Sequence, residues 1–91
     1  MNDINHNEQS QRFETTVDGT TAYISYVDNG DVIVYDHTIV PDAIGGRGIA
    51  GELTKHALDY ARKQGKKVVP ACSYVASYLQ KHPEYSDLKV Q

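Results

Sequence analysis

Residues 44–70 read IGGRGIAGELTKHALDYARKQGKKVVP, and this stretch decides the fold. From Ile49 onward, apolar side chains recur about every four residues, which is typical of one face of an amphipathic helix. Gly65 suits the C-terminal end of that helix, because the residue there often adopts a positive φ. The short apolar run at residues 66–70 then has the character of a strand. The stretch therefore predicts a helix over about 48–64, entered from a glycine-rich loop and followed by a strand.

Before the glycine-rich loop, three segments alternate between apolar and polar residues, which is typical of half-buried strands. Asp18-Gly19 separates the first two segments and Asn29-Gly30 precedes the third, and both pairs favour the tight turns of hairpins. Pro41 ends the third segment, since proline cannot donate a hydrogen bond to a strand ladder. The sequence therefore predicts an antiparallel meander of three strands, over residues 12–17, 20–27 and 32–40.

A second helix is predicted over residues 73–81, where Pro83 stops it. The order of elements is then β-β-β-α-β-α, and the strand–helix–strand part is expected to cross over right-handed. The predicted fold class is α/β with a mixed α+β sheet, in which the three-stranded antiparallel meander is followed by a β-α-β unit and a C-terminal helix. Residues 1–11 are almost wholly polar, which predicts a disordered tail, and residues 12–91 then form a single domain.

The composition excludes several classes of function. The 91 residues carry a formal net charge of −3, which argues against nucleic-acid binding, since that needs many cations to neutralise phosphates. No apolar run approaches the ~20 residues of a membrane span, and the polar N-terminus does not resemble a signal peptide. Cys72 is the sole cysteine, so it forms no internal disulfide, and the histidines lack metal-ligand spacing with carboxylates. We therefore expect a cytoplasmic protein with no metal.

The glycine-rich loop has four glycines within residues 45–51, more than a turn needs. Residues 46–51 match the dinucleotide pattern G-x-G-x-x-G, which also requires an acidic residue about 20 positions later. No Asp or Glu lies between Asp59 and Glu84, so we exclude a dinucleotide domain. Bare N–H groups at the head of a helix still form a site suited to phosphate or pyrophosphate. The alternative is that the glycines only permit a tight strand-to-helix turn.

Residues 37–85 resemble the GCN5-related N-acetyltransferase superfamily, in particular its minimal, single-domain branch. The acetyl-CoA loop of the superfamily reads Arg/Gln-x-x-Gly-x-Gly/Ala. Gly48 and Ala50 fill the last two defined positions, Gly45 stands where Arg or Gln is usual, and Arg47 supplies a nearby basic residue. The downstream pattern VVPACSY followed by HPEY is more specific to the small branch than the glycine loop is.

The resemblance implies acetyl-CoA as co-substrate and an amine as acceptor. It implies that the strand over 32–40 splays from the strand over 67–71, and that the pantothenate arm pairs with main chain exposed between them. The loop amides would hold the pyrophosphate. The cofactor-binding residues implied in this way are Ile39, Val40, Gly45, Gly46, Arg47, Gly48, Ile49, Ala50, Cys72 and Tyr78.

Acetyl transfer to an amine needs a base, donors for the oxyanion and an acid for the departing thiolate. His37 is the best candidate for the base, because histidine titrates near neutral pH and the residue shares a strand face with Ile33, Tyr35 and Ile39. A half-buried histidine bonded to a carbonyl explains the same sequence equally well. The resemblance favours the catalytic role, since the small branch tends to show His-Thr before its Val-Pro.

Cys72 is the second predicted catalytic residue, because a thiol just before a helix has a lowered pKa. It would accept the acetyl group, serve as acid to the CoA sulfur or line the pocket, whereas a buried inert cysteine is the structural alternative. In larger relatives a tyrosine is often the acid, and alignment puts Gln80 at its position, which leaves Tyr74 or Tyr78 as substitutes.

The basic cluster Arg62, Lys63, Lys66 and Lys67 is compatible with the 3′-phosphate of CoA, although a solvated helix C-terminus explains it better.

The expected function is acetyl-CoA-dependent N-acetyl transfer to an unidentified amine. The alternative is a CoA-binding or acetyl-CoA-binding module, or an acyl carrier through Cys72, without robust amine acetylation. A redox-responsive thiol protein is a third hypothesis. The acceptor and the oligomeric state stay open.

Overall fold

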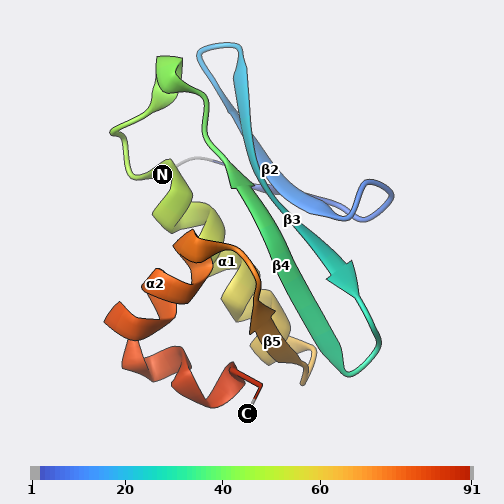
Figure 1. The fold of residues 1–91 in the computed structure, drawn as a ribbon. Coiled ribbons are helices and arrows are strands. Elements are labelled where there is room, and N and C mark those ends of the chain that lie inside the picture. Colours follow the sequence, from blue (N-terminus) through green and yellow to red (C-terminus); the bar gives the residue numbers. More distant parts are fainter. Residues whose placement is uncertain (1–2, 91) are drawn as a thin grey trace.

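The computed structural model describes residues 3–90. Within that range the chain forms one five-stranded sheet, two α-helices and two short 3-10 helices (Figure 1). The strands are β1 (Asn5–Asn7), β2 (Arg12–Val17), β3 (Thr20–Asp28), β4 (Val32–Ile39) and β5 (Lys67–Pro70). The helices are η1 (Asp42–Ile44), α1 (Ile49–Lys63), α2 (Ser73–Lys81) and η2 (Pro83–Leu88).

The strands lie in the sheet in the order of the chain, β1-β2-β3-β4-β5. The first four strands pair antiparallel, and β5 pairs parallel to β4 after the crossover through α1. A parallel pair needs such a crossover, because its strands cannot be joined by a tight turn. The predicted mixed sheet, with a meander, a β-α-β unit and a C-terminal helix, is therefore confirmed.

The N-terminal segment differs from the disordered tail predicted for residues 1–11. Asn5–Asn7 forms β1, which pairs antiparallel with β2. The His6 ring stacks on Phe13 with 4.3 Å between centroids, and its Nε2 lies 2.6 Å from the Tyr26 hydroxyl. These contacts with distant residues order a polar segment that has no apolar pattern of its own, so the tail prediction is wrong for this part. Met1 and Asn2 lie outside the described residues.

One face of the sheet packs against the helices and forms the core. The Tyr35 hydroxyl, itself fully buried, donates a hydrogen bond of 2.6 Å to the Ala57 carbonyl of α1. Burial of each large apolar side chain stabilises the fold by roughly 1.5–3 kcal/mol. The core thus fixes α1 over the sheet, with its first turn at the end of the loop that follows β4. The buried core residues on α1 and the sheet include Phe13, Ile24, Tyr26, Ile33, Tyr35, Ile49, Leu53, Ala57, Leu58 and Val68.

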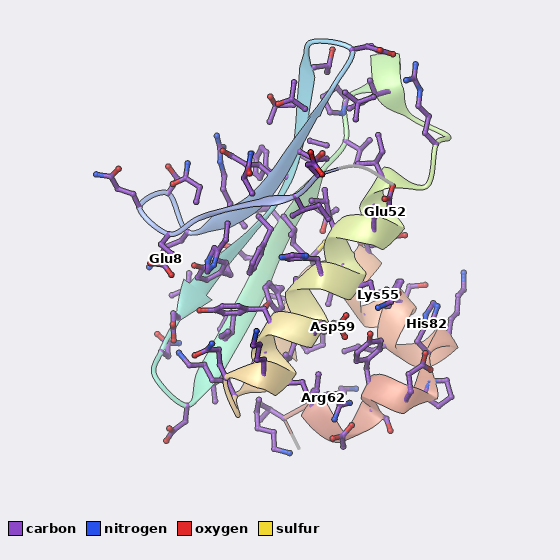
Figure 2. The ribbon with its side chains drawn as sticks, turned by 180° about the vertical axis from the view of Figure 1, so that it is seen from behind. Glu8, Glu52, Lys55, Asp59, Arg62 and His82 are labelled. Carbon is purple, nitrogen blue, oxygen red and sulfur yellow. The ribbon has the colours of Figure 1, made fainter. Side chains whose placement is uncertain are left out.

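The C-terminal segment makes several polar contacts with the C-terminal half of α1. Arg62 makes two hydrogen bonds to the Asp87 carboxylate, of 3.0 and 2.9 Å, and the Tyr85 hydroxyl donates to Asp59 over 2.6 Å. Lys55 pairs with the other oxygen of Asp59. Figure 2 shows Lys55, Asp59 and Arg62 along the side of α1 that faces this segment. Exposed ion pairs contribute little individually. Burial of the Tyr85 ring and of neighbouring apolar side chains therefore contributes most of the free energy that stabilises this segment.

Candidate active site

The parallel pairing of β4 with β5 ends partway along β4. Tyr35 and Pro70 are their last partners, and the Cys72 N–H then donates to the Tyr35 carbonyl over 3.0 Å. Beyond that point β4 runs on to Ile39, while the chain after β5 turns away into α2 (Figure 1). Along residues 36–39, β4 is therefore paired with β3 but, within residues 3–90, with no strand on its other side.

The open half of β4 begins with a β-bulge at Asp36. Tyr26 is opposite Tyr35 and Ser25 is opposite His37, so Asp36 is the extra residue between two successive pairs. The Ser25 hydroxyl donates a hydrogen bond of 2.7 Å to the Asp36 carboxylate across the bulge. One extra residue reverses which side chains face the core, because successive side chains of a strand alternate between its two faces.

The bulge corrects the predicted orientation of His37. We expected His37 and Ile39 to share a face with Ile33 and Tyr35, but the reversal turns both toward the opposite face. Each is exposed, with Ile39 at 44%, whereas Ile33 and Tyr35 are fully buried. Thr38 is the residue that turns inward, opposite the buried Ile24. His37 is thus accessible from the sheet face that the core does not occupy.

Cys72 lies at the head of α2, half-buried beside the inward-facing Thr38. Its Sγ is 3.4 Å from the Thr38 Oγ1. Burial alone would raise the pKa of the thiol, but the Thr38 hydroxyl and the N–H groups of Val75, Tyr74 and Thr38 stabilise the thiolate, and the pKa falls below its ordinary value. The sulfur forms no hydrogen-bonded cap on α2, so the helix N–H groups act on it as nearby dipoles. The thiolate, which is the nucleophilic form, is therefore more accessible to Cys72 than to an unperturbed cysteine.

The glycine-rich loop ends in a backbone that few residues other than glycine adopt. Gly46 and Gly48 both have φ of +76°, and Gly48 is the left-handed N-cap of α1. The N-cap makes no side-chain hydrogen bond, and the first N–H groups of any α-helix have no acceptor within the helix. A Cβ added at Gly46 or Gly48 would meet no atom within 4 Å, which leaves open space in front of the loop. The arrangement suits an anion.

The other predicted cofactor-binding residues of the loop differ in what they offer. Gly45 is exposed, and its N–H is used by η1, where it donates to the Asp42 carbonyl. Arg47 forms an ion pair of 2.7 Å with Asp18 of the β2–β3 turn. The side chain of Ile49 is buried in the core, and the Ala50 carbonyl accepts from Thr54. Ile49 and Ala50 therefore present only their N–H groups at the head of α1, while Val40 packs against the core at the end of β4.

Tyr74, in the first turn of α2, lies close to the head of α1. Its hydroxyl lies 3.6 Å from the position of a Cβ built on Gly51, in the first turn of α1. Tyr78 lies one turn further along α2, where its ring stacks on His82 with 3.8 Å between centroids and burial raises its pKa. The Tyr74 hydroxyl thus lies close to the start of α1, and the cofactor-binding role of Tyr78 stays a prediction.

The predicted basic cluster is largely occupied by acidic partners. Lys66 makes two hydrogen bonds to Asp28, and Arg62 makes two to Asp87. Lys67 donates to the Asp87 carbonyl. These bonds favour the hypothesis of a solvated helix C-terminus over that of a phosphate site.

Residues 3–90 contain no group of three or more His, Cys, Asp or Glu side chains arranged to hold a metal ion. Over the same residues, no helix is long and apolar enough to cross a bilayer.

Two features of the site were not predicted from the sequence. Thr38 was not a candidate, although it directly follows His37, because only the bulge turns it toward Cys72. The bond between Ser25 and Asp36 was missed for the same reason. The one available signal is Asp36 itself, an acidic residue within a run of β-branched and aromatic residues, where strands seldom carry one.

Comparisons with known proteins show the family to which the chain belongs. The model of the family described as GCN5-related N-acetyl-transferase matches residues 12–88. Protein NATD1 of Mus musculus is 36% identical over 83 residues, which cover 88% of this chain and 76% of the mouse protein. The Homo sapiens protein of the same name is 35% identical over 83 residues, covering 88% and 74%.

Among solved structures, the NMR structure of a GCN5-like protein from Staphylococcus aureus matches with a TM-score of 0.76 and 30% identity, over 97% of this chain and 87% of that one. The fold and the site thus define a small acyltransferase-type domain with a strand–glycine loop–helix unit. The chain belongs to the GCN5-related N-acetyltransferase family, as the resemblance of residues 37–85 predicted.

Proposed function

We propose that this protein transfers the acetyl group of acetyl-CoA to the nitrogen of an amine. The observation that carries the proposal is that the open half of β4 lies beside both helix heads, one with bare glycine N–H groups and the other with Cys72. The Tyr74 hydroxyl lies 3.6 Å from the position that a Cβ on Gly51 would occupy, so the two helix heads lie close together. Membership of the family supports the same substrate.

The proposed binding mode uses main chain at both ends. The N–H groups at the head of α1, over residues 46–50, hold the pyrophosphate. The pantothenate arm lies along residues 36–39 of β4, as an added strand would. This places the thioester toward Cys72, at the point where β4 and β5 separate.

In the proposed reaction the lone pair of the amine attacks the acetyl carbonyl carbon. A C–N bond forms, the C–S bond of acetyl-CoA breaks, and CoA leaves as a thiolate that takes up a proton from the solvent. His37 accepts the proton that the amine nitrogen releases. Because His37 faces away from the core, the amine approaches from the uncovered face of the sheet.

A second candidate function is favoured by the lowered pKa of Cys72. The thiolate form is a good nucleophile and has no proton to donate, so a lowered pKa favours the role of acyl acceptor over that of acid for Cys72. Its sulfur would attack the same carbonyl carbon, form a new C–S bond and release the CoA thiolate. The product is an S-acetyl cysteine, which either waits as an acyl carrier or passes the acetyl group to an amine.

The binding half of the proposal is tested with two glycines at opposite ends of α1. Gly48 and Gly65 have φ of +76° and +71°, and a Cβ at either would meet nothing within 4 Å. Gly48→Ala and Gly65→Ala therefore cost a similar roughly 1–2 kcal/mol of backbone strain. We expect only Gly48→Ala to weaken acetyl-CoA binding, by about tenfold, in a titration followed by amide resonances. If the amides of residues 46–50 do not move in the unaltered protein, the proposal is wrong.

The catalytic half is tested by mass spectrometry with acetyl-CoA and a panel of amines. Transfer that falls at least 100-fold, the lower end of about 10²–10⁴ for a general base, in His37→Ala supports amine acetylation. A stable gain of one acetyl group on the protein, absent in Cys72→Ser, supports the acyl carrier. Binding with neither product contradicts both and leaves a CoA-binding module.

A further inference from the structure

The Cys72 sulfur has a partner that the proposed reaction does not use. The Thr38 Oγ1 lies 3.4 Å from this sulfur. Within the described part of the chain, it is the side-chain group that forms a hydrogen bond with the sulfur. A hydroxyl accepts a hydrogen bond from a thiol and donates one to a thiolate. The contact therefore persists when Cys72 loses its proton, and it becomes stronger because the acceptor is then charged.

Thr38 reaches Cys72 because of the bulge. If β4 alternated without interruption, Thr38 would point away from the core, as Val34 does. The extra residue, Asp36, places Thr38 opposite Ile24, whose side chain is fully buried in the core. The orientation of the Thr38 hydroxyl thus depends on the bulge staying at this position of the strand.

The bulge is closed by a hydrogen bond between neighbouring strands. The Ser25 hydroxyl on β3 donates to the Asp36 carboxylate on β4 over 2.7 Å, and the contact is partly buried. A hydrogen bond to a charged acceptor is stronger than one between neutral groups. Ser25 and Asp36 therefore oppose a slip of the register, which would move the extra residue along β4 and turn Thr38 outward.

We propose that Thr38 is a positioning residue that orients the Cys72 sulfur and stabilises its thiolate, and that Ser25 and Asp36 act as a clamp that keeps Thr38 turned inward. The value of this arrangement for acyl chemistry rests on the proposed function, whereas the arrangement itself is testable without CoA. The Thr38 hydroxyl and N–H are both among the groups that lower the pKa of Cys72.

The test is the pH profile of Cys72 alkylation by iodoacetamide in the full chain. Cys72 is the sole cysteine, so the rate reports one thiol. The variants are Thr38→Val, which removes the hydroxyl at nearly constant shape, and Thr38→Ser, which restores it. Thr16→Val, at an exposed threonine of β2 paired with Thr21, is the matched control.

We expect the profiles of the unaltered protein and Thr38→Val to cross. Loss of the hydroxyl bond leaves about tenfold less thiolate at neutral pH, and the more basic thiolate is about threefold more nucleophilic. Alkylation then slows about threefold at neutral pH and speeds up about threefold where the thiol is fully ionised. Thr38→Ser and Thr16→Val should follow the unaltered protein. A simple gain in thiol exposure would speed alkylation at every pH, and that result, or superimposed profiles, overturns the role of Thr38.

The clamp is tested with Ser25→Ala and Asp36→Asn. Ser25→Ala removes the donor and should move both the Thr38 amide resonance and the alkylation profile in the direction of Thr38→Val, whereas Asp36→Asn keeps an acceptor oxygen and should move them less. An unchanged Thr38 resonance in Ser25→Ala overturns the clamp. Acetyl-CoA binding separates the two proposals. If acetyl-CoA does not bind the unaltered protein, but the alkylation profile of Thr38→Val still crosses that of the unaltered protein, the proposed function fails and the positioning role stands.

Discussion

The two halves of β4 belong to one strand but differ in pairing and burial. Residues 32–35 pair with β3 on one side and β5 on the other, and they bury Ile33 and Tyr35 completely. Residues 36–39 begin with a bulge, pair with β3 alone within the described range, and leave His37 and Ile39 exposed. The division falls where β5 ends, at the pair formed by Tyr35 and Pro70.

This difference indicates how a chain of 91 residues would carry both a core and the proposed site. A domain this small buries only about 60% of the surface that its unfolded chain exposes, so it cannot leave much of a central strand unpaired. The first half of β4 supplies stability, and the second half supplies main chain and side chains that a ligand can reach. Local opening should therefore be easier in the second half.

The largest expected effect separates the two halves by stability. Ile33→Ala removes a fully buried side chain and should lower the free energy of unfolding by about 3 kcal/mol, through lost transfer energy and the cavity left behind. Ile39→Ala makes the same chemical change on the same strand at a side chain that is 44% exposed, and should cost less than about 1 kcal/mol. Urea unfolding followed by circular dichroism measures both. Equal costs would mean that the second half belongs to the core.

A smaller effect is expected at the boundary between the halves. Tyr35→Phe removes the hydrogen bond of 2.6 Å to the Ala57 carbonyl and should cost about 1 kcal/mol. Tyr23→Phe, on the outward face of β3 under Arg12, is the matched control and should cost less than about 0.5 kcal/mol.

The same pair of variants is expected to differ in the pH dependence of the free energy of unfolding at alkaline pH. Burial raises the pKa of Tyr35 above its ordinary value of 10.0, so the folded state keeps a proton that the unfolded chain loses. The stability linked to this proton is complete below about pH 10 and is lost as the pH rises further. Burial raises the pKa of Tyr26 to about 12 in the same way. Stability should therefore fall less steeply above pH 10 in Tyr35→Phe than in Tyr23→Phe, and equal slopes would contradict the assignment.

The sequence predicted the first half of β4 well because its signals are local. Alternation and the Asn29-Gly30 turn placed the strand, and the four-residue apolar period placed α1 to within one residue at each end. The prediction of α2 over residues 73–81 coincides with the structure, since Pro83 marks its end locally.

The second half of β4 was harder to predict because its geometry depends on partners elsewhere in the chain. The apolar alternation runs through the bulge without a break, so the residues alone put His37 on the wrong face and hid the contact between Thr38 and Cys72. Strand β1 was not predicted for a related reason, because the segment is ordered by the contacts of His6 with Phe13 and Tyr26. The glycine loop was recognised because its pattern lies within a few consecutive residues.

The smallest expected change in stability is at His37. Its side chain is exposed on the outward face, so His37→Ala should alter the free energy of unfolding by less than about 0.5 kcal/mol. His56→Ala removes another exposed histidine, on α1 at the edge of the Phe13 ring, and serves as the matched control. Urea midpoints measured beside transfer rates distinguish the two roles of the residue.

A stable His37→Ala protein that has lost amine transfer, beside an active His56→Ala protein, would place a chemical function in the open half of β4. A destabilised His37→Ala protein would instead make the residue a structural part of the strand, and the division at Tyr35 would then be wrong. When the measured stability change is close to zero, loss of transfer cannot be attributed to unfolding, and the comparison between the two halves becomes a direct test of which one carries the chemistry.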